Sequence, residues 1–320
     1  MKVARALKAA RSASDPSKTP SKASVSSSSA GPPYNATILK GNESSLMHEC
    51  LAKRSWWRPT PEGEKYSFWW GGNGQHFDWE AGYSADPKQA RQQLVCRFRR
   101  ACEVCTKPRL AVNLRRYARE AKIDLGSLIP LTFVVNAGDE SNELSRFKTT
   151  AASLAGDQGE SIWIVKPRNQ NRGIGIEVCQ SAKAVEAHLK KRKKGSEHIV
   201  QKYIERPLLL RGRKFDIRQF VLVTPDLQVF MYRDSYVRTC STAYDAANVA
   251  DKSMHLTNDF VQKFLPSYGQ HEDANKLSFA ELQAMTTRRT ADHPADLMST
   301  ADSLRSAVMS TADSLWSADC

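Results

Sequence analysis

The sequence predicts an α+β fold, because strand-like segments follow one another in its second half with few helices between them. Short runs rich in β-branched and aromatic residues are typical of strands, and they occur at 162–165, 175–178, 199–203, 215–223 and 229–232. Helical patterns occur at 183–191 and 260–264. This order favours an α+β sheet domain over a doubly wound one. The 320 residues, 41% of them hydrophobic, can form one large or two smaller cores.

The chain divides into four expected parts by composition. Residues 1–33 are basic and rich in serine, and we expect a disordered tail there in preference to an organelle transit peptide. Residues 34–150 form a smaller α/β region, in which an amphipathic helix at 107–122 precedes a strand near 129–135. Residues 151–285 contain the strands listed above. Residues 286–320 repeat an eleven-residue step and are predicted to be a low-complexity tail.

The net charge of +13 indicates an acidic partner: nucleic acid, anionic lipid or an acidic protein tail. Seven scattered cysteines, an odd number, favour a reducing, cytoplasmic location. Cys102 and Cys105 form a lone CxxC motif, which we interpret as half-buried helix cysteines and not as a zinc or redox site. No apolar run reaches the length of a membrane span, so we expect no membrane partner.

A row of charges alternates with apolar residues in the predicted strand 215–223 and just before it. Lys214, Asp216 and Arg218 share one face of this strand, because successive side chains point to opposite faces. Phe215, Ile217 and Val221 are expected to pack on the other face. Burying such a row is costly unless something polar binds to it. The alternative interpretation is an ion-paired edge strand.

Further polar motifs flank the other predicted strands. Lys166 ends an apolar strand, where burial penalises its ammonium unless an anion binds there. Arg172 and Gly173 lie in a glycine-containing loop suited to close approach of a ligand. The strand end 201–204 precedes a proline-broken linker, which leaves backbone groups available for a flat heterocycle.

These motifs resemble, in order and spacing, those of the tubulin tyrosine ligase-like family, whose members are ATP-grasp amino-acid ligases. The resemblance covers roughly residues 95–285 and is closer to the glutamate- and glycine-adding branches than to the tyrosine ligase. It implies an ATP-grasp-like sheet domain preceded by the smaller α/β region. The motifs that carry it are Trp163–Pro167, Arg172–Ile176, Gln201–Ile204, Lys214–Arg218, Tyr236–Arg238 and His255–Asn258.

The resemblance also implies roles for individual residues. The Lys202 carbonyl and the Ile204 amide would bind adenine, and Arg218 would neutralise the charge that is transferred. Arg238 and Lys263 would hold the carboxylate of the incoming amino acid, a task that suits a planar guanidinium. Asn258 would contribute to a Mg²⁺ site. The residues expected to contact ATP are Lys107, Lys166, Arg172, Gly173, Gln201, Lys202, Tyr203, Ile204, Lys214, Asp216, Thr257 and Asn258.

The implied reaction is ATP-dependent addition of glutamate or glycine to glutamates of a tubulin tail, that is, polyglutamylation or glycylation, through an acyl-phosphate. ATP, Mg²⁺, a free amino acid and the acidic tail of tubulin are the implied cofactors and partners. The implied location is the cytoplasm, on the cytoskeleton or in a cilium. The exposed-looking basic run 190–194 could steer an acidic tail, although a nuclear address or a solvated loop fits it equally.

The family pattern fails in one respect. Family members carry an aspartate and a Glu-x-Asn pair beyond the His-Leu-Thr-Asn motif as Mg²⁺ ligands, and residues 286–320 do not supply them in a strand-like frame. We therefore expect the C-terminal part of the ATP-grasp to be missing and transfer to suffer. A catalytically silent ATP- or tubulin-binding module is the alternative. A general nucleic-acid-binding protein would explain the charge but not the ordered motifs.

Overall fold

The structure is a computed structural model. It describes residues 34–41, 44–71, 77–90, 92–138, 142–155 and 161–292, with side chains to residue 285. The chain divides into two compact units, Met1–Ala101 and Cys102–Cys320. The predicted N-terminal tail and the eleven-residue repeats lie outside the described residues.

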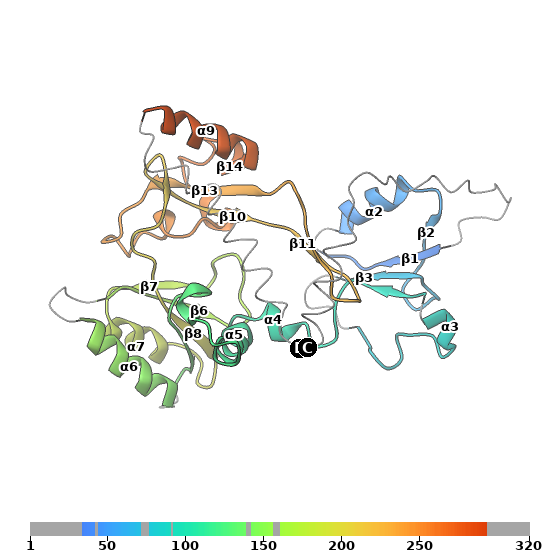
Figure 1. Cartoon of the computed structure of the whole chain (residues 1–320), viewed down its shortest axis with the longest axis horizontal. Helices are drawn as coiled ribbons and strands as arrows, with labels where there is room; N and C mark the ends of the chain where they lie inside the picture. The colour runs from blue at the N-terminus through green and yellow to red at the C-terminus, as the bar shows by residue number, and fades with distance from the viewer. Residues whose placement is uncertain are drawn as a thin grey trace. The chain divides into compact units, whose positions relative to one another are not determined.

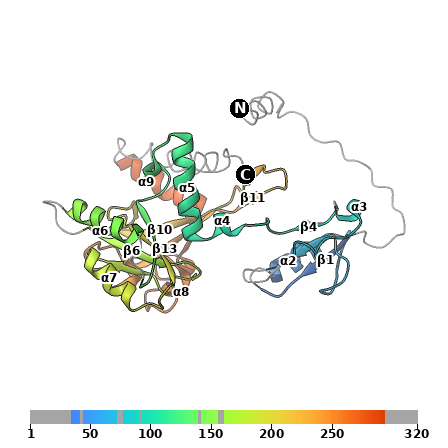
Figure 2. The same ribbon diagram turned by 90° about the horizontal axis from the view of Figure 1, so that it is seen from below.

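The first unit contains a parallel four-stranded sheet in the order β2-β1-β3-β4. The side chains of Trp69 and Phe77 are buried, with ring centroids 5.0 Å apart, so the aromatic residues of this region pack together. Helix α2 lies beside β1 and β2 (Figure 1 and Figure 2). The elements of this unit are β1 (Tyr34–Ile38), α2 (Ser44–Ala52), β2 (Trp57–Pro59), β3 (Phe68–Trp70), α3 (Pro87–Ala90) and β4 (Leu94–Val95).

The second unit begins with an antiparallel sheet in the order β5-β8-β6-β7, which helices α6 and α7 cover on one face (Figure 1). Trp163 is fully buried against Phe133 and Phe147, at centroid distances of 6.2 and 4.9 Å. Alternation along β6 turns Ile164 and Lys166 to the opposite face. The elements are α4 (Cys102–Cys105), α5 (Lys107–Ala121), β5 (Thr132–Asn136), α6 (Asn142–Ala155), β6 (Trp163–Pro167), β7 (Glu177–Cys179), α7 (Ala182–Lys190) and β8 (Glu197–Lys202).

A second antiparallel sheet of this unit has the order β14-β13-β10-β9, and helix α9 packs on it through the buried Leu282. Among the described strands, β11 and β12 form a separate two-stranded sheet. The elements are β9 (Leu209–Leu210), β10 (Arg213–Arg218), β11 (Val221–Val223), β12 (Val229–Met231), β13 (Tyr236–Ala243), α8 (Asp259–Gln262), β14 (Lys276–Ser278), α9 (Phe279–Asp292) and the 3-10 turns Leu125–Ser127, Lys252–Met254 and Asp273–Asn275. The predicted mixture of helix and sheet is confirmed.

Two strand predictions were wrong in extent. The strand predicted over 215–223 is broken after Arg218, and Val221 lies 48% exposed in β11, so it does not pack with Phe215 and Ile217. Pairing of β10 with β13 ends at Tyr236, opposite Arg218, so no partner of that sheet holds the following residues. The strand predicted from residue 175 begins at Glu177, because Gly175 has a φ of +71°.

Strand β13 was not predicted, since its alternating polar residues give no apolar pattern. Thr239 and Ser241 are nevertheless buried, because side chains from distant segments bond to them or their backbone. Asn275 Nδ2 donates to the Thr239 carbonyl at 3.0 Å and to Ser241 Oγ at 2.8 Å. Gln262 Oε1 accepts from the Ser241 amide at 2.7 Å. Satisfied hydrogen bonds thus make a polar strand suitable for the interior.

Three other expectations from the sequence differ from the structure. Cys102 and Cys105 lie on the four-residue helix α4, but both are exposed, because this helix buries no side chain; their predicted half-burial was wrong. Residues 286–292 continue helix α9, so a separate tail does not begin at 286. The boundary expected between residues 150 and 151 falls inside helix α6.

A buried ion pair joins the second sheet to the segment before β14. Arg213 and Glu272 are 4% and 7% exposed, and Arg213 Nη1 donates to Glu272 Oε2 at 2.9 Å. Arg213 Nη2 also contacts Glu272 Oε1, and Thr239 Oγ1 donates to Glu272 Oε2 at 2.8 Å. Burial raises the pKa of Glu272, but the hydrogen bonds and charge of Arg213 and the Thr239 hydroxyl outweigh it, so the net pKa is lowered.

Substitution Arg213→Met should destabilise the second unit by about 3–5 kcal/mol, because it leaves the Glu272 carboxylate buried without its cation. Urea unfolding at neutral pH measures this loss. Arg146→Met is the control: Arg146 is 59% exposed in its ion pair with Glu143, and its removal should cost less than about 1 kcal/mol. Equal losses of stability in the two variants would show that burial of the ion pair does not set the cost of removing its cation.

Candidate functional site

The candidate site begins at Lys166, on the face of the first sheet turned away from α6 and α7. Lys166 Nζ donates to Gln201 Oε1 at 2.8 Å, and Gln201 Nε2 donates to Thr132 Oγ1 at 2.8 Å. The pKa of Lys166 is lowered from 10.5 to about 8, by burial first and then by the charges of Lys214 and Lys107. A neutral amide is thus its hydrogen-bond partner, and two further cations lie close enough to oppose its charge.

Lys214 comes to the same site from strand β10 of the second sheet. Its Nζ donates to the Tyr203 hydroxyl at 2.8 Å and lies 4.4 Å from the centre of that ring. Burial lowers the pKa of Lys214, against smaller opposite effects of Cys240 and Asp216. The hydrogen bond joins the two sheets of the unit, since Tyr203 directly follows β8.

Lys107 is the third cation, at the first position of helix α5. Its Nζ donates to the backbone carbonyls of Pro167 at 3.2 Å and Gln170 at 2.8 Å. Burial lowers its pKa. Lys107 therefore holds the start of the loop that follows β6, in addition to adding positive charge to the site.

The loop predicted to close over phosphates packs tightly on the start of helix α8. Arg172 and Gly173 both have left-handed backbone conformations, with φ of 58° and 78°. A Cβ on Gly173 would lie 3.2 Å from both Asn258 Oδ1 and Val261 Cγ2, so a side chain there meets neighbours in a strained conformation. Thr257 is buried, and the Arg172 guanidinium lies over the Phe260 ring, 5.9 Å from its centre.

The predicted adenine segment leaves the end of β8. The Tyr203 amide donates to the Ile162 carbonyl at 3.0 Å, while the Ile204 side chain is 55% exposed. The Lys202 ammonium forms an ion pair with Glu205. This pairing argues against a nucleotide contact by the Lys202 side chain. Only the backbone of Lys202 and Ile204 thus remains as the predicted adenine contact.

Two predicted substrate residues have partners within the chain. Arg238 pairs across the strands with Asp216: Nε donates to Oδ1 at 2.9 Å and Nη2 contacts Oδ2. The hydrogen bonds with Asp216 raise the pKa of Arg238 despite its burial. Lys263 Nζ lies 5.4 and 5.0 Å from the ring centres of Phe260 and Phe264. Arg218 is exposed at the end of β10.

In the row of charges on β10, Asp216 and Lys214 therefore have different kinds of partner. Asp216 pairs with Arg238, as in the ion-paired alternative, but β10 lies between β13 and β9 and is not the edge strand which that alternative expected. Lys214 bonds only to neutral groups in the contacts described above. Phe215 and Ile217 pack on the opposite face, as predicted.

His255 and Tyr244 were not assigned roles from the sequence, although both lie at this site. His255 Nδ1 is 2.8 Å from the Tyr203 hydroxyl, and the Tyr244 ring centre lies 5.8 Å from that of His255. His255 opens the His-Leu-Thr-Asn motif, which was the available signal. Its partners come from segments that are remote in the sequence.

The described residues do not fit a complete Mg²⁺ site. Within the described ranges, no group of three His, Cys, Asp or Glu side chains lies close enough to hold a metal. Asn258 offers an amide oxygen, and the Asp216 carboxylate is bound to Arg238. Mg²⁺ needs about six oxygen ligands in octahedral geometry, so these two groups are insufficient.

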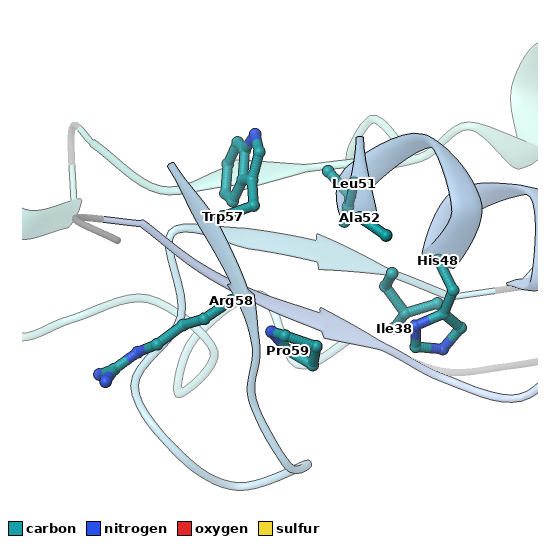
Figure 3. Close-up of a pocket in the computed structure, with 7 residues that line it drawn as sticks. All are labelled: Ile38, His48, Leu51, Ala52, Trp57, Arg58 and Pro59. Carbon is teal, nitrogen blue, oxygen red and sulfur yellow. The ribbon is translucent and has the colours of Figure 1, made fainter. Parts of the chain in front are cut away.

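A small hollow exists in the first unit, between α2 and strands β1 and β2 (Figure 3). The Arg58 side chain points away from it in Figure 3, which leaves His48 as its one ionisable group. Its lining residues are Ile38, His48, Leu51, Ala52, Trp57, Arg58 and Pro59. An almost wholly apolar lining does not suit a charged ligand, so the candidate site stays with the cations of the second unit. Among the described helices, none is long and apolar enough to cross a membrane.

Most of the chain matches a known protein family. The model of the family described as "Tubulin-tyrosine ligase family" matches residues 85–317. The match begins before residue 95 and continues past 285, so the similarity is longer than the sequence motifs indicated. The prediction that the family pattern ends near 285 is not confirmed.

Several curated proteins are similar to parts of the chain. "Probable tubulin polyglutamylase ttll-9" of Caenorhabditis elegans is 30% identical over 72% of this chain and 55% of its own length. "Tubulin polyglutamylase TTLL7" of Homo sapiens is 30% identical over 61% of this chain and 21% of its own length. "Tubulin monoglycylase TTLL3" of Homo sapiens is 44% identical over 35% of this chain and 15% of its own length. The chain thus spans about half, or less, of the length of these relatives.

Substitution Lys166→Met should stabilise the ligand-free protein at pH 7, because it removes the cost of burying an ammonium among other cations. The lowered pKa of Lys166 corresponds to about 3 kcal/mol. Below pH 8 both folded and unfolded Lys166 are charged and the full cost is present; it falls as pH rises from about 8 to 10.5. The advantage of the variant should shrink over that range.

Urea unfolding of both proteins at several pH values measures this difference. Lys148→Met serves as a control, since Lys148 is 40% exposed in its ion pair with Glu186. A variant that is less stable than the parent at pH 7 would contradict an unneutralised Lys166.

Proposed function

Since the chain belongs to the tubulin-tyrosine ligase family, we propose that its second unit binds ATP at Lys166 and Lys214. We further propose that it uses ATP to join an amino acid to a glutamate of a tubulin tail. The observation that carries this proposal is the gathering of three partly dehydrated ammonium groups, those of Lys107, Lys166 and Lys214, whose pKa values burial lowers. A polyphosphate would supply the negative charge that these groups lack.

The geometry around these cations supports the remaining nucleotide contacts that we propose. The left-handed pair Arg172–Gly173 would bring backbone amides close to the phosphates, next to Asn258 and the buried Thr257. The Lys202 carbonyl and the Ile204 amide would bind adenine. Gln201 would hold Lys166 in place, since it already accepts from that ammonium.

In the proposed reaction, a tail carboxylate oxygen attacks the γ-phosphorus of ATP, and ADP leaves with the bond electrons. The amine of the free amino acid then attacks the carbonyl carbon of the acyl-phosphate. Inorganic phosphate leaves, the nitrogen loses a proton and an amide forms. The exposed guanidinium of Arg218 would neutralise the transferring phosphoryl group.

Arg238 would orient the amino acid. Asp216 occupies its Nε and Nη2, which fixes the guanidinium plane and leaves Nη1 for a substrate carboxylate. Lys263, held over two exposed phenylalanine rings, would be a second and more mobile carboxylate ligand. The names of the similar proteins, a polyglutamylase and a monoglycylase, favour glutamate or glycine as the amino acid. Acting on tubulin, the protein would be associated with the cytoskeleton, including that of cilia.

Mg²⁺ would accompany ATP in such a reaction and would neutralise its phosphates. Asn258 is the residue among those described that would contribute to its binding. The incomplete set of ligands in the described ranges favours a second candidate function, a catalytically silent module that binds ATP or tubulin. The ligase and an ATP-binding silent module share the nucleotide site, and only the ligase transfers an amino acid.

The basic run Lys190–Lys194 would attract the acidic tail of tubulin. All five of its side chains are exposed, at the turn between α7 and β8. The residues that follow this turn pair with the end of β6, since the Arg168 amide donates to the Glu197 carbonyl at 3.0 Å. The turn therefore lies at the sheet edge from which the proposed phosphate loop departs. Electrostatic attraction there would speed the encounter with an acidic peptide.

A transfer assay tests the proposed reaction. Protein incubated with tubulin, Mg·ATP and labelled glutamate or glycine should label tubulin, and Lys166→Met or Arg218→Ala should lower the rate by about a hundredfold or more, because each removes a cation from the developing charge. Arg146→Met, at an exposed position outside the site, should keep the parent rate. Transfer that survives both site substitutions would refute the assignment.

The same proteins separate the two candidate functions. ATP binding that Lys166→Met abolishes, without transfer by the parent protein of any of glutamate, glycine or tyrosine, would establish the silent module. Absence of ATP binding in the parent protein would refute the ligase and the ATP-binding form of the silent module.

Reversing charge at the basic turn should weaken binding of an acidic tubulin-tail peptide about tenfold, mainly through slower association. The variant is Lys191→Glu with Lys193→Glu, and Arg116→Glu with Arg119→Glu is the control, because both arginines are exposed on α5 and the change in net charge is equal. Fluorescence anisotropy at low and high salt measures it. Equal weakening by both variants would show an effect of net charge alone.

A further inference from the structure

A chain of three hydrogen-bonded side chains crosses the candidate site. Lys214 Nζ donates to the Tyr203 hydroxyl at 2.8 Å, and this hydroxyl is 2.8 Å from His255 Nδ1. His255 Nε2 is 2.9 Å from the Asn248 carbonyl. Tyr203 and His255 are 5% and 3% exposed, so water does not readily replace either partner.

The partners of His255 fix where its ring proton lies. A carbonyl oxygen can only accept, so Nε2 must carry the proton that faces Asn248. In the neutral ring, Nδ1 is then an acceptor, and the Tyr203 hydroxyl must donate to it. This orientation turns the lone pairs of the hydroxyl to the Lys214 ammonium, which is a donor only.

Burial is the main reason that the His255 ring stays neutral at neutral pH. Burial lowers its pKa below 6.5, and Lys214 lowers it further, against the raising effects of the Asn248 carbonyl, Asp251 and Asp245. A neutral ring is the form that this hydrogen-bond order requires.

We propose that His255 is a positioning residue of the nucleotide site, which acts on Lys214 through the hydroxyl of Tyr203. The inference rests on the proposed function, in which Lys214 binds ATP. His255 holds the hydroxyl in an orientation whose lone pairs face the ammonium, and the ammonium keeps a fixed direction at the end of a flexible side chain.

The placement of the three residues makes the role specific. Tyr203 follows the first sheet, Lys214 lies in the second sheet, and His255 follows the turn Lys252–Met254. Without the ordered hydroxyl, Lys214 would lose its one hydrogen-bond partner among the described contacts and would sample several rotamers. Ordering it again on ATP binding costs conformational entropy.

Two kinds of substitution separate hydrogen bonding from packing. Tyr203→Phe removes the hydroxyl and keeps the ring. His255→Asn places an amide oxygen near the position of Nδ1 and retains the acceptor, whereas His255→Gln places its amide near Nε2 and loses the acceptor. Tyr203→Phe and His255→Gln should bind ATP about tenfold more weakly, while His255→Asn should stay close to the parent.

A matched control is His198, which lies in the sheet that Tyr203 follows. His198 is 3% exposed on β8, and its Nδ1 bonds to the Ser196 carbonyl. His198→Asn removes an equally buried imidazole outside the chain of hydrogen bonds and should leave ATP affinity unchanged. Thermal unfolding of every variant shows which losses of affinity reflect destabilisation.

A second readout does not depend on ATP. The rate at which an acetylating succinimide ester modifies Lys214, followed by peptide mass spectrometry, should rise several-fold in Tyr203→Phe and His255→Gln, because their ammonium is no longer held. Nitrogen-15 NMR of the histidine rings should show His255 with its proton on Nε2 in the parent protein.

The outcomes distinguish the two proposals. Unchanged Lys214 modification in both variants, or a proton on Nδ1 of His255, would overturn the positioning role even if ATP binds. Parent protein that binds no ATP, with the modification rates changed as expected, would refute the proposed function and leave the arrangement of His255, Tyr203 and Lys214 intact. Equal loss of ATP affinity in His255→Asn and His255→Gln would reduce His255 to a packing residue.

Discussion

The burial of two lysine ammonium groups is the constraint on which the candidate site depends. Lys166 and Lys214 come from different sheets of the second unit, and their charges oppose each other. Among the described residues, neither ammonium has a carboxylate as hydrogen-bond partner, since Lys166 bonds to the neutral Gln201, Lys214 bonds to Tyr203, and Asp216 is engaged by Arg238. Without a ligand, burial of two ammonium groups that have no anionic partner is unfavourable. Binding of an anionic ligand is the simplest way to offset this cost.

Contacts between the first sheet and the segment that follows β13 give this pair its geometry. An apolar cluster that includes Ile164, Val178 and Leu256 lies on the face of the first sheet opposite α6 and α7. An ion pair between Lys252 and Glu177, with N and O atoms 2.9 Å apart, adds a polar tie at its margin. Burial of the apolar residues supplies most of the stabilising free energy, whereas the polar contacts fix the relative positions of charged side chains. The site is therefore a product of the packing of both layers.

The sequence allowed much of this unit to be anticipated, and its errors have physical causes. Apolar β-branched runs located β6 and β8, because fully buried strands leave that signal. Strand β13 escaped notice since its buried Thr239 and Ser241 are satisfied by Asn275, 34 or more residues away. The extension of β10 to residue 223 failed because strand propensity does not report where a partner strand ends.

By itself, the sequence determined the identity and order of the chemical groups: lysines at the ends of apolar strands, a glycine loop and an alternating charged strand. These are local features, and the periodicity of a strand assigns each to a face. Tertiary structure alone decided which charges stay unpaired, since Asp216 bonds to Arg238 while Lys214 bonds to Tyr203. The reason is that pairing depends on distances between segments that are remote in the chain, and these are set only when the two sheets pack.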